Sequence, residues 1–334
     1  MGDFVLRMPV LNEADEEHHD TDQLIVIPYP EQSESPLSTR EKFQTVKSLI
    51  GNESSTIQLH DFVIEELRHF LADKGDDRFP LNQGFSNEEL LDRITRYEKS
   101  VWDLCGLLVS LAYWARPSHK IILQKVIARS TDRLDEVAGI QIWRSLRYYP
   151  IILELYTSGI AAVDGGRYDC LSEILFTRIP ATQFHNQEQY FAEVVTKGIG
   201  EILSNGTFNR VPGHERHYVP LSEYLFKLLQ PMLDDILFIG TSYERSFDEF
   251  EILFALTVAD IKKQKQHTAW GPIGRFGWKQ QNYTEPPFSK LVAEARQQQS
   301  RWPPLLAGLF GGDYQRFLAV AEDFQKILSQ RSYW

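Results

Sequence analysis

The stretch that decides the fold is Ser86-Asn-Glu-Glu-Leu-Leu-Asp-Arg-Ile-Thr-Arg-Tyr-Glu-Lys-Ser-Val-Trp-Asp-Leu-Cys-Gly-Leu-Leu-Val-Ser-Leu-Ala-Tyr-Trp-Ala115. A serine whose hydroxyl can cap a first turn, with a glutamate three residues later, marks a helix start. Behind Ser86 the apolar side chains recur every three or four residues, which is the spacing of one helix face. We therefore expect one long helix from Ser86 to about Ala115, ended by Pro117, that forms the spine of the fold.

The rest of the chain also favours helices. Similar helix starts occur at Ser38 with Glu41 and at Ser246 with Glu249. Apolar periodicity further predicts helices over 121–134, 221–238 (broken or kinked at Pro231), 247–265, 288–298 and 314–328. Only residues 1–36 contain β-prone runs. The sequence predicts a mainly α protein, a multi-helix bundle or orthogonal array with a short N-terminal β-prone arm.

Residues 139–178 resemble a helical hairpin of the tetratricopeptide (TPR) type. Pro150 can open its first helix and Gly165-Gly166 can end it. No second copy follows at a fixed period, so a repeat array is not predicted. The loop-like stretch 205–220 is the best candidate boundary. We expect three parts: an extended or hairpin arm over 1–36, a helical domain over 37–204, and a C-terminal helical subdomain over 205–334.

Two turns in the C-terminal subdomain are rich in tryptophan and glycine. They are Trp270-Gly-Pro-Ile-Gly-Arg-Phe-Gly-Trp278 and Trp302-Pro-Pro-Leu-Leu-Ala-Gly-Leu-Phe-Gly-Gly312. Glycine permits positive φ and close backbone approach, and the aromatic side chains supply a large area for burial. We therefore expect both turns to be clamped onto the helical body.

Composition limits the class of protein. The formal net charge of −11 argues against a surface built for nucleic acid, because phosphate binding needs many Lys and Arg side chains on one face. Cys105 and Cys170 lie in apolar helical patterns, which predicts buried free thiols and a reducing compartment. The first residues lack a secretory signal, and the most apolar run, 101–115, is shorter than the roughly 20 residues that a bilayer requires. We expect a cytoplasmic protein without membrane contact.

No catalytic signature is present, and no catalytic residue is predicted. One candidate pocket surrounds the first Trp/Gly turn, and its residues are Tyr243, Asp248, Glu251, Trp270, Arg275 and Trp278. Asp248 or Glu251 would pair there with Arg275. The alternative, which we favour, is a structural role in which Arg275 stacks on the two neighbouring indoles and fixes the turn.

Three patterns resemble metal-ligand motifs, and each has a plainer interpretation. Glu66 and His69 share a helix face, but a di-metal carboxylate site needs a second such pair and two more carboxylates, so a solvated pair is favoured. Adjacent residues in Glu16-Glu-His-His-Asp20 point in different directions. Gly213-His-Glu-Arg-His217 spaces its histidines by three residues, whereas the zinc-peptidase motif spaces them by four. No metal or other cofactor is predicted.

Several motifs together resemble a known type of protein region. They are Trp143-Arg-Ser-Leu-Arg-Tyr-Tyr-Pro150, Tyr156-x-x-Gly-Ile-Ala-Ala162, Tyr243-x-x-x-Phe-Asp-x-Phe-Glu251, Gly271-Pro-Ile-Gly-Arg-Phe-Gly-Trp278 and Ala307-Gly-Leu-Phe-Gly-Gly312. Residues 140–312 resemble the helical C-terminal region of uncharacterised bacterial multidomain proteins, which elsewhere follows Schlafen-type ATP-binding or sirtuin-like domains. Neither domain is visible here. The resemblance implies a sensor, scaffold or regulatory role in bacterial conflict, and it assigns no catalytic residue.

These observations lead to one expected function and two alternatives. We expect a non-catalytic scaffold, sensor or regulatory protein whose partner is another protein. The first alternative is a hydrolase or nucleotide-processing enzyme with a site assembled from dispersed acids, Arg275 and the 205–220 loop. The second is binding of single-stranded nucleic acid by the basic and aromatic residues of 262–279, which the net charge disfavours.

Overall fold

The predicted spine is a single helix, α3 (Asn87–Trp114). Ser86 caps it as expected, since its hydroxyl accepts a hydrogen bond of 3.1 Å from the backbone N–H of Glu89. Residues 104–112 of α3 are all buried, so this half of the helix needs partners on every side. Its most extensive partner is α6 (Tyr149–Asp164).

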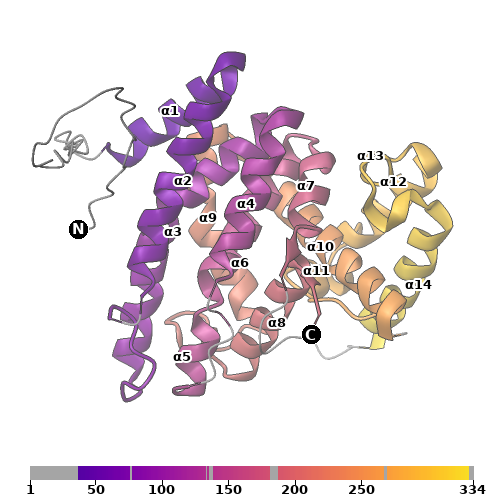
Figure 1. Ribbon diagram of the computed structural model, residues 1–334. Helices are drawn as coiled ribbons and strands as arrows, with labels where there is room; N and C mark the ends of the chain where they lie inside the picture. Colours follow the sequence, from indigo (N-terminus) through magenta and orange to yellow (C-terminus); the bar gives the residue numbers. More distant parts are fainter. Residues whose placement is uncertain are drawn as a thin grey trace, which may run out of the picture. The chain divides into compact units, whose positions relative to one another are not determined.

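The computed structural model describes residues 37–330 apart from 76, 133, 135–137, 181–186 and 267–268. The predicted N-terminal arm, with its Glu16–Asp20 stretch, lies outside the described residues. Within them the protein is mainly α-helical, as the sequence predicts (Figure 1). The other helices and strands are α1 (Thr39–Gly51), α2 (Thr56–Asp73), α4 (Lys120–Ser130), α5 (Gln141–Leu146), α7 (Tyr168–Leu175), β1 (Arg178–Ile179), β2 (Gln189–Tyr190), α8 (Phe191–Ser204), α9 (Pro220–Leu237), α10 (Tyr243–Gln266), α11 (Phe276–Asn282), α12 (Pro287–Gln298), α13 (Pro303–Leu306) and α14 (Tyr314–Gln330).

The helices from α1 onward cluster into one unit around α6. Helices α1 and α2 pack against α3, and α6 packs against α3, α7, α8, α9 and α10. Helices α12 to α14 lie at the far end from α3, where α12 and α14 pack against α10 and α13 contacts α7 (Figure 1). Helix α9 follows the 205–220 loop but contacts α3 and α6, which precede it, so the helices on the two sides of this loop share one core.

Several local predictions are confirmed. Helix α6 ends at Asp164, and Gly165-Gly166 follow it with a positive φ at Gly166. Cys105 and Cys170 are both free and buried. In the second Trp/Gly turn, Gly308, Gly311 and Gly312 all have positive φ, the conformation that favours glycine. Trp302 is buried there against Phe317, with ring centroids 4.8 Å apart.

Other local predictions are wrong. Helix α10 begins at Tyr243, and Ser246 lies inside it because its hydroxyl donates to the Asp164 carboxylate on α6 (2.9 Å). Helix α9 is not broken at Pro231, whose ring lies on an exposed face while Leu229 and Leu233 are buried. Helix α4 stops at Ser130 and not at 134. Outside the arm, β1 and β2 form a short antiparallel ladder that is too brief to produce a period-2 pattern.

Three helix-interior glycines lie against aromatic rings. A methyl group added at Gly106 would lie 2.0 Å from the Phe43 ring, at Gly159 2.1 Å from the Phe250 ring, and at Gly198 2.4 Å from the Tyr148 side chain. These contacts set how closely α3, α6 and α8 approach their partners. The free-energy cost of glycine inside a helix is therefore offset by this close packing.

We expect Gly159→Ala to lower the free energy of unfolding by about 1–3 kcal/mol, because the added methyl group overpacks the α6–α10 contact. Gly200→Ala is the matched control. Gly200 is also inside a helix, α8, but nothing lies within 4 Å of an added methyl group, so alanine there should raise stability by about 0.5–1 kcal/mol. Urea unfolding of both variants measures the two signs. A stabilised Gly159→Ala protein would contradict the close α6–α10 contact.

Candidate functional site

The first Trp/Gly turn is seated on α10 through its glycines. A Cβ at Gly271 would lie 2.0 Å from the carbonyl oxygen of Ala255, and a Cβ at Gly274 would lie 2.1 Å from both carboxylate oxygens of Glu251. No side chain fits at either position. This confirms the expectation that the turn is clamped onto the helical body, and it explains two glycines of the 271–278 motif.

Glu251 is the centre of a buried hydrogen-bond network. Its Oε1 accepts from the hydroxyls of Tyr156 (2.9 Å) and Ser222 (2.6 Å), and its Oε2 accepts from the backbone N–H of Arg275 (2.9 Å). Burial raises the pKa of the Glu251 carboxyl to about 7, and the hydrogen bonds from Ser222 and Tyr156 offset this only in part. The network joins α6, α9 and α10 to the turn.

The side chain of Arg275 takes a different partner from the two predicted. Its guanidinium stacks on the ring of Phe226 (3.4 Å to the centroid), not on an indole, and its Nε lies 3.2 Å from Oε2 of Glu223. Trp278 donates its indole N–H to the other oxygen of Glu223 (2.9 Å). Arg275 is 7% exposed. Its guanidinium therefore holds the turn against α9.

The three remaining predicted pocket residues, Asp248, Trp270 and Tyr243, each have a different partner. Asp248 pairs with the buried Lys279 on α11 (2.5 Å). Trp270 lies under the ammonium of Lys262 (4.0 Å), and Tyr243 donates its hydroxyl to the carbonyl of Phe226 (2.7 Å). The structure thus brings Glu251 and Trp278 to Arg275, through its backbone N–H and through Glu223. Asp248 pairs with Lys279 and not with Arg275, although Glu244 lies near both cations (2.7 Å from Lys279 and 3.6 Å from Arg275).

Sequence reasoning missed the residues that complete these contacts. Glu223, Phe226 and Ser222 come from α9, and Lys279 comes from α11, a helix inside a stretch that reads as a loop. In the sequence, Lys279 stands out only as one of the basic residues of 262–279. Nothing local in the sequence connects any of them to α10, because each contact spans 17 residues or more.

A cavity of about 440 Å³ lies between α10, α11 and α12, and we call it the acid-lined cavity. Its lining residues are Thr241, Glu244, Arg245, Asp248, Glu249, Ile252, Lys279, Tyr283, Glu285, Pro287, Lys290, Leu291 and Glu294. Five of these side chains are carboxylates and three are cations. Of the predicted pocket residues, Asp248 alone lines it.

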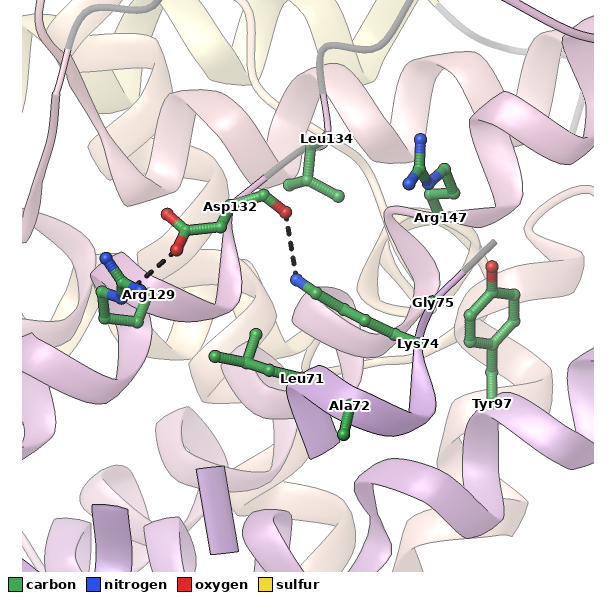
Figure 2. Close-up of a pocket in the computed structure, with 9 residues that line it drawn as sticks. All are labelled: Leu71, Ala72, Lys74, Gly75, Tyr97, Arg129, Asp132, Leu134 and Arg147. Carbon is green, nitrogen blue, oxygen red and sulfur yellow. Dashed lines mark hydrogen bonds and ion pairs between the residues drawn. The ribbon is translucent and has the colours of Figure 1, made fainter. Parts of the chain in front are cut away.

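A second cavity, of about 320 Å³, lies at the C-terminal ends of α2 and α4 (Figure 2). Lys74 reaches across it and donates to the carbonyls of Ser130 (2.8 Å) and Asp132 (3.1 Å), while Arg129 pairs with the Asp132 carboxylate (3.2 Å). A cation at these carbonyls complements the negative end of α4. Lys74 therefore caps the C-terminal end of α4.

Glu154 on α6 is fully buried in the core near this second cavity. Burial raises the pKa of its carboxyl to about 8, and the Ser130 hydroxyl and the Lys74 ammonium offset this only in part. The carboxyl is therefore mainly protonated at pH 7. An ordinary carboxyl would have lost its proton well below that pH.

The other candidate motifs have structural partners. Glu66 is not solvated: it is buried, and its Oε2 pairs with Lys42 at 2.8 Å. His214 and His217 pack edge to face, with ring centroids 5.0 Å apart. In the part of the chain that the structure describes, no three His, Cys, Asp or Glu side chains form a cluster able to hold a metal ion.

The cations of 262–279 are largely neutralised by acids. Lys263 pairs with Asp323 (2.7 Å), and Lys265 pairs with Glu193 (2.8 Å). Arg275 and Lys279 are buried in the pairs described above. Few of these charges therefore face solvent unpaired, which reduces the support for phosphate binding here.

Comparison of the chain with family models, curated proteins and solved structures gives no match. The resemblance to bacterial multidomain proteins therefore stays a prediction from the motifs. Among the described residues, no helix is both long enough and apolar enough to span a bilayer.

We expect Gly274→Ala to lower the free energy of unfolding by about 3 kcal/mol or more. The new methyl group would displace the Glu251 carboxylate and break its buried hydrogen bonds. Gly84→Ala is the control, because nothing lies within 4 Å of an added methyl group there. Chemical denaturation of both variants makes the comparison. Equal stabilities would contradict the close seat of the turn on α10.

The raised pKa of Glu154 predicts a pH-dependent stability. Between its ordinary value of 4.5 and about 8, the folded state holds a proton that the unfolded state has released, so stability falls as pH rises through this window. Glu154→Gln should remove part of this fall, on the order of 2 kcal/mol between pH 5 and pH 8. The pH dependence of stability that remains in this variant is expected to come from Glu251, whose pKa is also raised. Denaturant unfolding at several pH values measures it, with Glu65→Gln on the exposed face of α2 as the control.

Proposed function

We propose that this protein is a non-catalytic helical scaffold, sensor or regulatory protein that acts through protein–protein contacts. The main support for the proposal is that the groups best suited to catalysis have structural roles. Arg275 is buried between Phe226 and Glu223, and the Glu251 carboxylate is enclosed by three hydrogen bonds and the Cα of Gly274. These groups hold the fold together, whereas the acid-lined cavity opens to the surface and is available for contact.

The acid-lined cavity suits a contact surface because its rim is exposed while its floor is fixed. Glu244, Glu285 and Glu294 are exposed, whereas Asp248 and Lys279 are buried beneath them. A rigid floor lowers the entropy lost when a partner binds. We place this surface in a cytoplasmic protein. The link to bacterial conflict depends only on the motif resemblance.

One observation favours the enzyme alternative. A cavity of about 140 Å³ lies where the end of the 205–220 loop meets the first Trp/Gly turn, and Tyr218, Ser222 and Trp270 line it. Ser222 could serve as a nucleophile only with a base that takes its proton. Its hydroxyl donates to Glu251, which is therefore the candidate base, but this carboxylate is fully buried and also accepts from Tyr156 and from the backbone N–H of Arg275, so both groups belong to the network that fixes the turn. The scaffold function therefore has the stronger support.

The proposal predicts a second protein bound to the chain in its own host. We would purify the protein at its native level and record a native mass spectrum, which reports bound protein, metal, nucleic acid and small ligands together. A scaffold should carry a partner of defined mass, and the complex should survive Ser222→Ala. A bound small molecule without any partner protein, or activity that Ser222→Ala abolishes in a folded protein, would contradict the scaffold function and support the enzyme.

A further inference from the structure

We propose that the acid-lined cavity receives an arginine side chain from a segment of the partner protein. This inference depends on the scaffold function proposed above, since it names the chemistry of the partner. It is carried by three features of the cavity: carboxylates without a cation, a buried oxygen without a donor, and an apolar wall.

The first feature is an excess of acid in the lining, with five carboxylates and three cations. Lys279 lies between Asp248 (2.5 Å) and Glu244 (2.7 Å), and Lys290 pairs with Glu285 (3.0 Å).

Two further carboxylates, Glu249 and Glu294, have no cation within ion-pair distance among the described residues. Tyr168 donates its hydroxyl to Glu249 (2.5 Å), and Gln298 donates to Glu294 (3.0 Å). Arg245 also lines the cavity. Its charge lowers the pKa of Glu249, but by less than other effects raise it. Burial, and then the charge of Glu294, raise that pKa. A cation between the two carboxylates would relieve their repulsion.

The second feature is an oxygen of Asp248. The Asp248 side chain is 7% exposed, and its Oδ2 pairs with Lys279. Its Oδ1 is buried and has no hydrogen-bond partner among the described residues. A buried acceptor without a donor is costly, and Asp248 lines the cavity. A ligand that brings several N–H donors into the cavity satisfies this oxygen when the Asp248 carboxylate turns toward it.

The third feature is the apolar part of the lining. Ile252, Pro287 and Leu291 supply aliphatic surface, and Tyr283 supplies an aromatic ring held edge to face by Trp278 (5.8 Å between centroids). This combination fits a side chain with an aliphatic stem and a charged head. Arginine fits better than lysine, because its planar guanidinium has five donors, pairs with two carboxylates and stacks on aromatic rings.

The test uses a dye-labelled peptide, acetyl-Gly-Arg-Gly-Arg-Gly-amide, and the same peptide with citrulline in place of arginine. Citrulline keeps the shape and loses the charge. Fluorescence anisotropy should show binding of the arginine peptide at least tenfold tighter than of the citrulline peptide. The variant Glu249→Gln/Glu294→Gln should weaken the arginine peptide about tenfold or more. Both substitutions conserve shape, and Glu294 is exposed, so folding should be retained, as unfolding curves will check.

The matched control is Glu65→Gln/Glu88→Gln, which removes the half-exposed carboxylate of Glu65 on α2 and the exposed carboxylate of Glu88 on α3, away from the cavity. It should change the affinity less than twofold. Equal binding of the two peptides, or equal loss in the cavity variant and the control, would overturn the inference, because binding would then reflect shape or net charge alone.

The host complex separates this inference from the scaffold function. A partner that is lost from Glu249→Gln/Glu294→Gln, kept by the control, and displaced by the arginine peptide supports both. A partner that remains on the cavity variant overturns the arginine inference and leaves the scaffold function intact. Absence of any partner protein contradicts the scaffold function, and arginine-peptide binding would then indicate a small guanidinium compound in place of the proposed partner segment.

Discussion

The burial of α6 along its whole length is the constraint on which the rest of this structure depends. Residues 149–163 are all buried, so the helix has no face that can be left to solvent. Helices α3, α7, α8, α9 and α10 each cover part of it. The later helices α12 and α14 then cover α10. The order of the layers follows from the need to enclose one apolar helix.

A charged or polar group inside this core therefore needs hydrogen bonds or neighbouring charges to compensate for its burial. Glu251 lies at the contact of α6, α9 and α10, where three donors surround it. Glu154, on α6 itself, has far weaker compensation, and its proton is retained to a higher pH. The hydroxyls of Ser222 and Tyr156 and the charge of Arg275 lower the pKa of Glu251, whereas the pKa of Glu154 is lowered only by Ser130 and Lys74. Hydrogen bonds to the charged form decide how far burial raises each pKa.

The sequence was sufficient for features that depend on local pattern. The spine, its Ser86 cap, the stop at Gly165-Gly166 and the burial of both cysteines are all encoded within a few helical turns. The identity of the partners of Arg275 was not encoded in this way. Phe226 and Glu223 lie some 50 residues away, and α11 was hidden because Gly274 and Gly277 make its surroundings resemble a loop. The predicted Asp248–Arg275 pair failed for the same reason, since Lys279 is one helical turn further on and reaches Asp248 first.

The glycine–aromatic contacts have a consequence for how the sequence can diverge. Gly106 with Phe43, Gly159 with Phe250, and Gly198 with Tyr148 each join a residue without a side chain to a large ring on another element. The two members of a pair share one fixed volume, so neither can change size alone without disturbing the helix spacing. In related chains the pairs should covary, either kept together or exchanged for two residues of intermediate size. Distant relatives of this fold are therefore best recognised by these paired positions rather than by overall identity.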